Sequence, residues 1–367
     1  MNNHDKLWDI FGGKKPDTYS IRQEMESIAE AAYEFYKLRK HEDALVGYRK
    51  AFKMAESVDD TENMIEYKWW TGHCLQRLNR YREALAEFLT LSQMKPIVPR
   101  DYFDGLINQL VIATCIPIEL YKIKGIVRQC YDFIQQNGMS NCESKILRNE
   151  SDLARFRYDY EHAFSLSTEA LAKHNKNAVT CYNEVSYYYD IMLNLVTLKQ
   201  LTSLRDWLLK LQDLDTKFTV SKQLYVLRFK VEIALLEGNT KEAYDFAKKH
   251  LRYNRETGSD CYVSLRLVIR TGISAGKLDS LKEYLIELAK LRNSEDGHMR
   301  YTIQKLFGEY HAACYNHNKS SQGFFAAKRY FNRALKIGIH IDRLLECDGR
   351  QKEIAELLGE IENIKNQ

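Results

Sequence analysis

The sequence contains few of the residues that end helices. Only 4 prolines and 17 glycines occur among its 367 residues. Proline and glycine disfavour helix interiors and often form the tight turns that connect strands. Their scarcity therefore favours an all-α chain of long helices over a fold built on sheets.

The sequence also lacks features of exported and membrane-spanning proteins. Its 8 cysteines are scattered, and no two of them form a Cys-x-x-Cys pair. The opening MNNHDKLWDIFGGKKP has no apolar core of the kind a signal peptide needs. The longest apolar stretch, Leu110–Ile118, is much shorter than a membrane span. These absences predict a cytoplasmic protein with reduced thiols and no membrane contact.

No large excess of either charge is present. The sequence has 54 Lys and Arg against 50 Asp and Glu, a formal net charge of +4. Proteins that bind nucleic acid usually have a clear basic footprint. Nucleic acid is therefore an unlikely partner, and the basic run Lys248–Arg255 is better explained as a solvated helix face.

Motifs of catalysis and cofactor binding are missing as well. The sequence has no GxxxxGK[ST] phosphate loop, GxGxxG turn, HExxH helix or GxSxG elbow. The nearest metal-like group is His311, Cys314 and His317, whose outer members would diverge around one helix without a fourth ligand nearby in sequence. We predict no catalytic residue, no metal, no cofactor and no enzymatic activity.

What the sequence does contain is a repeat of about 40 residues. In His41–Phe52 and Tyr81–Ser92, a small residue, an aromatic residue and a further small or apolar residue share one helical face. These residues are Ala44, Tyr48 and Ala51 in the first segment, and Ala84, Phe88 and Leu91 in the second. Markers of this kind recur at intervals of 37 to 46 residues: Ala44, Ala84, Ile126, Ala163, Leu204, Ala243, Leu281 and Ala327. The sequence therefore predicts eight repeats.

A second helical segment precedes each marker helix. In the second repeat, Gly72 lies twelve residues before the marker, and Ala32 holds the same register in the first repeat. A glycine in a helix interior costs up to about 1 kcal/mol relative to alanine. We expect the close approach of a neighbouring helix to compensate for Gly72. Each repeat is then a helix A, a short turn and a helix B.

The segment Trp69–Pro96 resembles a tetratricopeptide repeat (TPR). The family pattern of aromatic, small, turn, Tyr, Ala, aromatic and closing Pro is met by Trp69, Gly72, Asn79, Tyr81, Ala84, Phe88 and Pro96. The first repeat matches at Ala32, Phe35, Ala44, Tyr48 and Ala51. The resemblance implies an all-α fold, a right-handed α-solenoid of about eight TPR-like helix pairs over residues 20–340.

Both ends of the predicted solenoid differ from the repeats. Residues 341–367 have an amphipathic stripe, which predicts a C-terminal capping helix; its members are Ile354, Leu357, Leu358 and Ile361. Residues 1–19 contain the apolar cluster Leu7, Trp8, Ile10 and Phe11. We interpret this segment as a cap on the first repeat, with a docking peptide for a partner as the alternative.

The resemblance places the binding surface on helix A, which lines the concave groove of TPR proteins. The corresponding positions here are Tyr33, Tyr36, Lys37, His73, Gln76, Arg77, Asp152, Arg155, Arg228, Glu232, Arg266 and Arg270. Aromatic faces and guanidinium forks suit an extended peptide. Family members that clamp chaperone C-terminal tails use asparagines where this sequence has Tyr33 and His73, which argues against that role.

We predict a non-enzymatic adaptor or sensor that binds a peptide or protein segment in its groove. One alternative is a bacterial peptide-pheromone-sensing regulator, which the chain resembles in size and helical repeat build. Such regulators have a helix-turn-helix or a helical bundle before the repeats, and repeats that begin near residue 20 leave no room for either. A second alternative is an RNA-binding helical-repeat protein. The identity of the partner and the oligomeric state stay open.

Overall fold

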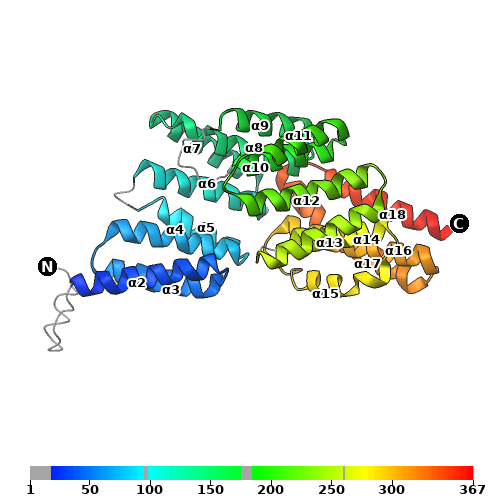
Figure 1. Cartoon of the computed structure of the whole chain (residues 1–367), viewed down its shortest axis with the longest axis horizontal. Helices are drawn as coiled ribbons and strands as arrows, with labels where there is room; N and C mark the ends of the chain where they lie inside the picture. Colours follow the sequence, from blue (N-terminus) through cyan, green and yellow to red (C-terminus); the bar gives the residue numbers. More distant parts are fainter. Residues whose placement is uncertain (1–17, 95–97, 117, 175–183, 259–260, 367) are drawn as a thin grey trace. The chain divides into compact units, whose positions relative to one another are not determined.

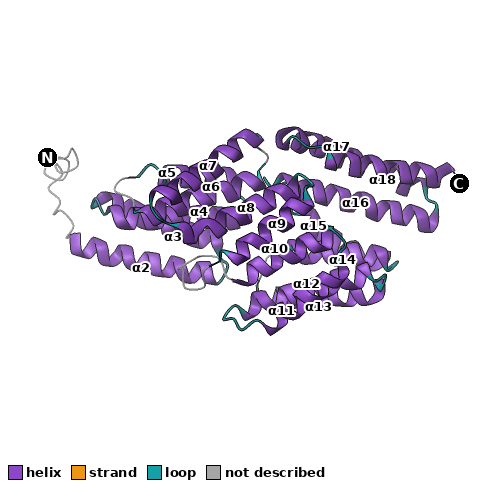
Figure 2. Cartoon of the chain, turned by 90° about the horizontal axis from the view of Figure 1, so that it is seen from above, coloured by secondary structure: helices purple, strands orange, loops and turns teal. Residues whose placement is uncertain are grey.

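The computed structural model describes residues 18–94, 98–116, 118–174, 184–258 and 261–366. The predicted N-terminal segment with its Leu7–Phe11 cluster lies outside these residues, as do Pro96 and Cys181. Within them, all regular secondary structure is helical (Figures 1 and 2). None of the described helices is both long enough and apolar enough to cross a membrane.

The described helices follow one another in eight pairs, with one further helix after them. The first four pairs are α2 (Thr18–Lys37) with α3 (His41–Ser57), α4 (Thr61–Arg77) with α5 (Tyr81–Leu91), α6 (Pro99–Cys115) with α7 (Leu120–Gln136), and α8 (Glu143–Phe156) with α9 (Tyr160–Ala172). The last four are α10 (Glu184–Thr197) with α11 (Leu201–Asp213), α12 (Thr219–Leu236) with α13 (Thr240–Glu256), α14 (Tyr262–Ser274) with α15 (Lys282–Ala289), and α16 (Gly297–Asn318) with α17 (Ser321–Leu345). The predicted all-α fold of sequential helix pairs is confirmed.

Three shorter or additional elements complete the described chain. The 3₁₀ helices η1 (Ser140–Cys142) and η2 (Leu278–Leu281) directly precede α8 and α15, and α18 (Gly349–Asn366) follows the last pair. Seven of the predicted markers lie inside the second helix of their pair, whereas Leu281 ends η2, just before α15. The α18 helix packs on α16 and α17 and buries Ile354 and Ile361 of the predicted stripe.

The chain divides into two compact parts, which we call the N-terminal body (residues 1–108) and the C-terminal body (residues 109–367). The N-terminal body contains α2 to α5 and the first part of α6. The C-terminal body contains the end of α6 and all later helices. Each body is described by itself below.

The turn between helix A and helix B has a left-handed residue in seven pairs. The φ angle lies between 52 and 78° at Arg39, Asn79, Tyr158, Lys199, Gly238, Gly276 and Lys319. In the α4–α5 turn, the amide of Arg80 donates to the carbonyl of Leu75, and the amide of Asn79 donates to the carbonyl of Gln76. This bonding pattern satisfies carbonyls at the end of helix A and reverses the chain within three residues. The predicted turn residue Asn79 therefore lies where a left-handed conformation is needed.

Close packing within a pair depends on a small residue in helix A. A Cβ atom added to Gly72 would lie 2.6 Å from Cζ of Phe88, whose side chain is fully buried. Gly308 of α16 faces the ring of Phe331 in α17 in the same way. The predicted compensation for Gly72 is thus confirmed, because its missing side chain provides the space that Phe88 fills.

Candidate functional site

The helices A of the C-terminal body line a pocket of about 340 Å³. Its walls come from α8, α10, α12, α14 and α16, with the α8–α9 turn, the start of α9 and the start of α18. We call it the arginine pocket, after the five arginines that line it: Arg155, Arg228, Arg266, Arg270 and Arg350. Its volume lies in the range of ligand sites in proteins.

Five of the predicted groove residues meet in this pocket: Arg155, Arg228, Glu232, Arg266 and Arg270. Positions four apart on a helix lie on the same face. Because Arg228 and Glu232 have this spacing on α12, and Arg266 and Arg270 have it on α14, each helix presents two charged side chains to the pocket. The sixth predicted residue of this body, Asp152, does not line the pocket but forms an ion pair with Arg155.

Most of the charges in the arginine pocket are paired. Glu232, whose side chain is only 5% exposed, forms an ion pair with Arg270. Lys305 of α16 lies 2.5 Å from a carboxylate oxygen of Glu353 in α18. Arg350 of α18 lies 2.8 Å from Oδ1 of Asp342. These pairs hold side chains of neighbouring helices in fixed positions around the cavity.

Arg228 is the most deeply buried cation of the pocket, with 3% of its surface exposed. Its guanidinium group lies 4.8 Å from the ring centroid of Tyr189 and donates from Nη1 to the Tyr189 hydroxyl. Its Nε is enclosed and has no hydrogen-bond partner among the described residues. Burial and the nearby Arg266 lower the pKa of Arg228 to about 9. The side chain is therefore a buried cation with unused hydrogen-bonding capacity.

The α18 helix closes one side of the pocket. Nη2 of Arg350 donates to the carbonyl of Phe156 at 2.9 Å. Glu353 accepts hydrogen bonds from the hydroxyls of Tyr158 (3.3 Å) and Tyr301 (2.5 Å). The ring of Tyr158 packs against Gly349, where a Cβ atom would overlap it. The last helix is thereby tied to the α8–α9 turn, and this contact was not predicted from the sequence.

His298 of α16 belongs to the same closure. Its ring stacks on Phe156 with a centroid distance of 3.9 Å, and its Nδ1 lies 2.9 Å from Nη2 of Arg350. Burial and the positive charge of Arg350 lower the pKa of His298 well below 6.5. A neutral imidazole that accepts from Arg350 is the form that fits this position.

The predicted residues of the N-terminal body form a second group. Tyr33, Tyr36, Lys37 and Arg77 line a pocket of about 290 Å³ together with Arg39, His41 and Trp70. Trp70 is the centre of this group: its ring lies 5.3 Å from that of Tyr33 and 5.1 Å from that of Tyr36, edge to face. Nε of Arg77 donates to the hydroxyl of Tyr36 at 3.3 Å.

His73 and Gln76 do not line this second pocket. The ring of His73 lies 4.0 Å from that of Trp69 and 5.5 Å from that of Phe88 in α5. Burial lowers the pKa of His73 to about 3. His73 therefore contributes to the interface between α4 and α5, because its ring contacts Phe88 of α5 as well as Trp69 of its own helix.

Among solved structures, the chain is similar to a Rap protein in complex with competence and sporulation factor. The TM-score is 0.52 at 9% sequence identity, and the match covers 93% of this chain and 98% of the Rap chain. The TPR domain of P58(IPK) matches 92% of this chain and 99% of that chain at 10% identity, but its TM-score of 0.25 is too low to support an argument. No family model matches the chain, and no curated protein matches it in sequence. The Rap match shows the fold alone: an all-α array of sequential helix pairs, in agreement with the predicted TPR-like architecture.

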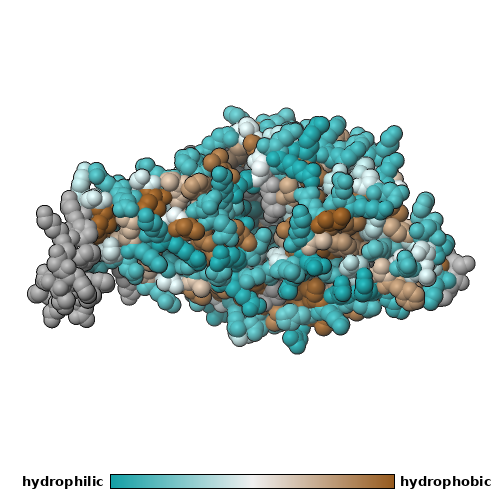
Figure 3. Space-filling view, turned by 90° about the horizontal axis from the view of Figure 1, so that it is seen from below, coloured by the Kyte–Doolittle hydropathy of each residue, from teal (hydrophilic) through white to brown (hydrophobic). Residues whose placement is uncertain are grey.

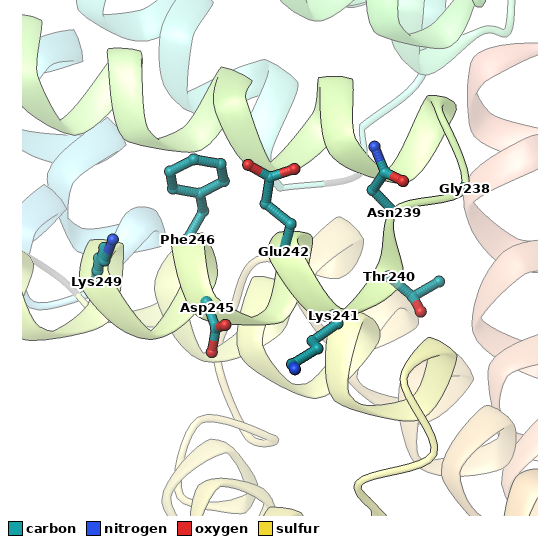
Figure 4. Close-up of a pocket in the computed structure, with 8 residues that line it drawn as sticks. All are labelled: Gly238, Asn239, Thr240, Lys241, Glu242, Asp245, Phe246 and Lys249. Carbon is teal, nitrogen blue, oxygen red and sulfur yellow. The ribbon is translucent and has the colours of Figure 1, made fainter.

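A larger hollow of about 610 Å³ lies at the α12–α13 turn. Figure 4 shows that its side chains diverge: Glu242 and Phe246 point toward α12, whereas Lys241 and Asp245 point away from it. A binding site needs polar groups that converge on a ligand. We therefore assign no site to this hollow.

The described residues contain no group of three His, Cys, Asp or Glu side chains that could hold a metal ion. His311, from the metal-like segment of the sequence, stacks on Tyr330 of α17 with an interplanar angle of 4°. Its ring therefore packs between α16 and α17.

The surface in Figure 3 is mostly hydrophilic, and its apolar residues form small separate patches. Large contiguous apolar patches usually mark surfaces that bind proteins or membranes. On the face drawn in Figure 3, no apolar patch is as large as a broad apolar interface would require. The convergent polar pockets are the stronger candidates for ligand binding.

Proposed function

We propose that this chain is a non-enzymatic adaptor or sensor that binds a short peptide in the arginine pocket. The observation that carries the proposal is the position of Arg228 and Arg266. Each lines the pocket, and neither has a carboxylate within ion-pair distance among the described residues. Guanidinium groups recognise carboxylates and backbone carbonyls, and the surrounding tyrosines offer faces for side chains. A peptide provides both kinds of group.

The Rap match supports the alternative of a peptide-sensing regulator that acts by protein–protein contact. That Rap protein was crystallised with competence and sporulation factor bound, and the match covers 98% of its chain. This coverage supports the alternative, because the likeness extends over nearly the whole Rap chain. We propose that the C-terminal body binds the ligand and that the N-terminal body, a separate compact part, contacts the partner protein.

The cytoplasmic location is part of the same proposal. None of the seven described cysteines is in a disulfide. Thiols in this state are typical of a reducing compartment. The ligand is then a peptide that is made in, or taken up into, the cytoplasm.

Peptide retention tests the proposal. The purified protein is mixed with a synthetic pool of random hexapeptides, separated from unbound peptides by gel filtration, and examined by mass spectrometry. We expect a defined subset of peptides to be retained by the parent and by Arg252→Gln, whose side chain is 74% exposed on α13. Arg228→Gln is expected to retain less, because it removes the buried cation. If the parent retains no peptide, the proposed function is wrong.

The N-terminal pocket needs a separate test. Tyr36→Ala and Arg77→Ala remove the two side chains that are hydrogen-bonded to each other there. We expect both variants to retain the same hexapeptides as the parent and to lose a protein partner captured from the native host. A loss of hexapeptide retention would move the peptide site to the N-terminal body.

A further inference from the structure

The charges of the arginine pocket do not balance. Six cationic side chains line it, and four of them have a carboxylate partner: Arg155 with Asp152, Arg270 with Glu232, Lys305 with Glu353, and Arg350 with Asp342. The lining carboxylates and these partners are five in number: Asp152, Glu232, Glu309, Asp342 and Glu353. One positive charge is therefore left over, and it is shared by Arg228 and Arg266.

These two arginines lie on neighbouring helices A, α12 and α14, and face the same cavity. Arg266 is, after burial, the largest influence that lowers the pKa of Arg228. Two like charges at short range in a poorly solvated site repel each other. An anion bound between them would remove this repulsion and would satisfy the enclosed Nε of Arg228.

The shape of the pocket restricts what this anion can be. Glu353 joins the α8–α9 turn to α16 through Tyr158 and Tyr301, so α18 blocks one side. A cavity of about 340 Å³ holds only a few residues of a peptide. A peptide terminus therefore fits this cavity better than the middle of a long chain does. A polyacidic segment would also meet Glu232, Glu309 and Glu353, which line the same walls.

We propose that the arginine pocket binds the C-terminal carboxylate of a short peptide between Arg228 and Arg266. The inference rests on the proposed function, because it specifies the ligand of that site. A single terminal carboxylate matches the single uncompensated charge, and its two oxygens suit two guanidinium forks. Residues before the terminus then extend toward the open side of the pocket, away from α18.

Two matched hexapeptide pools test the inference: one with free C-termini and one with C-terminal amides. We expect the parent and Arg252→Gln to retain the free-acid pool about tenfold better than the amide pool, since charged hydrogen bonds differ from neutral ones by about this amount. Arg228→Gln and Arg266→Gln should both lose this preference. Because Arg266 is only partly buried, Arg266→Gln keeps the test valid if Arg228→Gln folds poorly.

The possible outcomes separate the inference from the proposed function. Equal retention of both pools by the parent overturns the carboxylate inference and leaves peptide binding intact. Retention that follows the Asp and Glu content of the peptides, and not the terminus, also overturns it. Retention of neither pool contradicts the proposed function itself.

Discussion

Replacing Arg350 by methionine tests how α18 is held in place. Arg350 and Asp342 form an ion pair whose side chains are 4% and 0% exposed. Arg350 also donates to the carbonyl of Phe156, 194 residues earlier in the chain. Arg350→Met removes all of these contacts while keeping a long apolar side chain. The carboxylate of Asp342 is then left buried with only the amide of Gln351 and the thiol of Cys347 as donors.

Removing one partner of a buried ion pair typically costs about 3–5 kcal/mol, because the other charge stays desolvated. We expect Arg350→Met to lower the free energy of unfolding of the C-terminal body by this amount. The double variant Arg350→Met with Asp342→Asn should recover a large part of the loss, since it removes the uncompensated charge. Arg252→Met is the matched control, because the exposed Arg252 is expected to change stability by less than about 0.5 kcal/mol.

Urea unfolding followed by circular dichroism gives the change in stability, and hydrogen exchange followed by mass spectrometry locates it. Amides of α18 and of the α8–α9 turn should lose protection in Arg350→Met, whereas those of α2 to α5 should not. A change of less than about 1 kcal/mol, or the same loss in the double variant as in the single one, would show that the buried pair does not hold α18. Uniform loss of protection across both bodies would contradict the assigned location.

Three further variants test the packing, the turns and one buried histidine. Gly308→Ala should destabilise the protein by about 1–3 kcal/mol in urea titrations, because its Cβ atom would overlap the ring of Phe331; an unchanged midpoint would contradict this. Lys199→Gly should stabilise it by about 0.5–1 kcal/mol, because Lys199 has a φ of 56° that glycine adopts without strain. Burial lowers the pKa of His250, which is hydrogen-bonded to Ser264, from 6.5 to about 4. The stability that neutral His250 contributes is therefore complete above pH 6.5 and is lost as the pH falls toward 4. When the pH is lowered from about 7.5 to 5.5, the free energy of unfolding of His250→Gln should fall by about 1.3 kcal/mol less than that of the parent. Parallel profiles of stability against pH for the two proteins would refute the assignment.

The sequence was sufficient to predict those features that depend on local spacing. The close approach of a neighbouring helix at Gly72 was predicted because the small residue and its register are visible within one repeat. Asn79 was predicted as the turn residue for the same reason. Arg228 and Arg266 reach one pocket because the helix A register carries over from repeat to repeat. Each of these predictions needed only the periodicity of a helix and the size of a side chain.

The closure of the arginine pocket could not be predicted in this way. Phe156 and Arg350 have no shared pattern in the sequence, and their contact depends on how all the helices between them pack. Tyr158 gave no signal either, since a tyrosine at positive φ is unusual and no local rule places it there. His73, a predicted groove residue, has ring contacts with Trp69 and Phe88. The family's pattern of positions gives no information about these two contacts.

The tie between α18 and the α8–α9 turn also determines when the pocket can form during synthesis and folding. Each helical hairpin needs only contacts between residues close in sequence, and such contacts form quickly. The hydrogen bond from Arg350 to the carbonyl of Phe156 closes a loop of 194 residues. Closing this loop has an entropic cost that the short hairpins avoid. The hairpins can therefore fold as they leave the ribosome. The arginine pocket, however, lacks the side formed by α18 until that helix has been made. A chain that stops before Gly349 lacks one wall of the proposed ligand site, so we expect peptide binding only once the last helix is present.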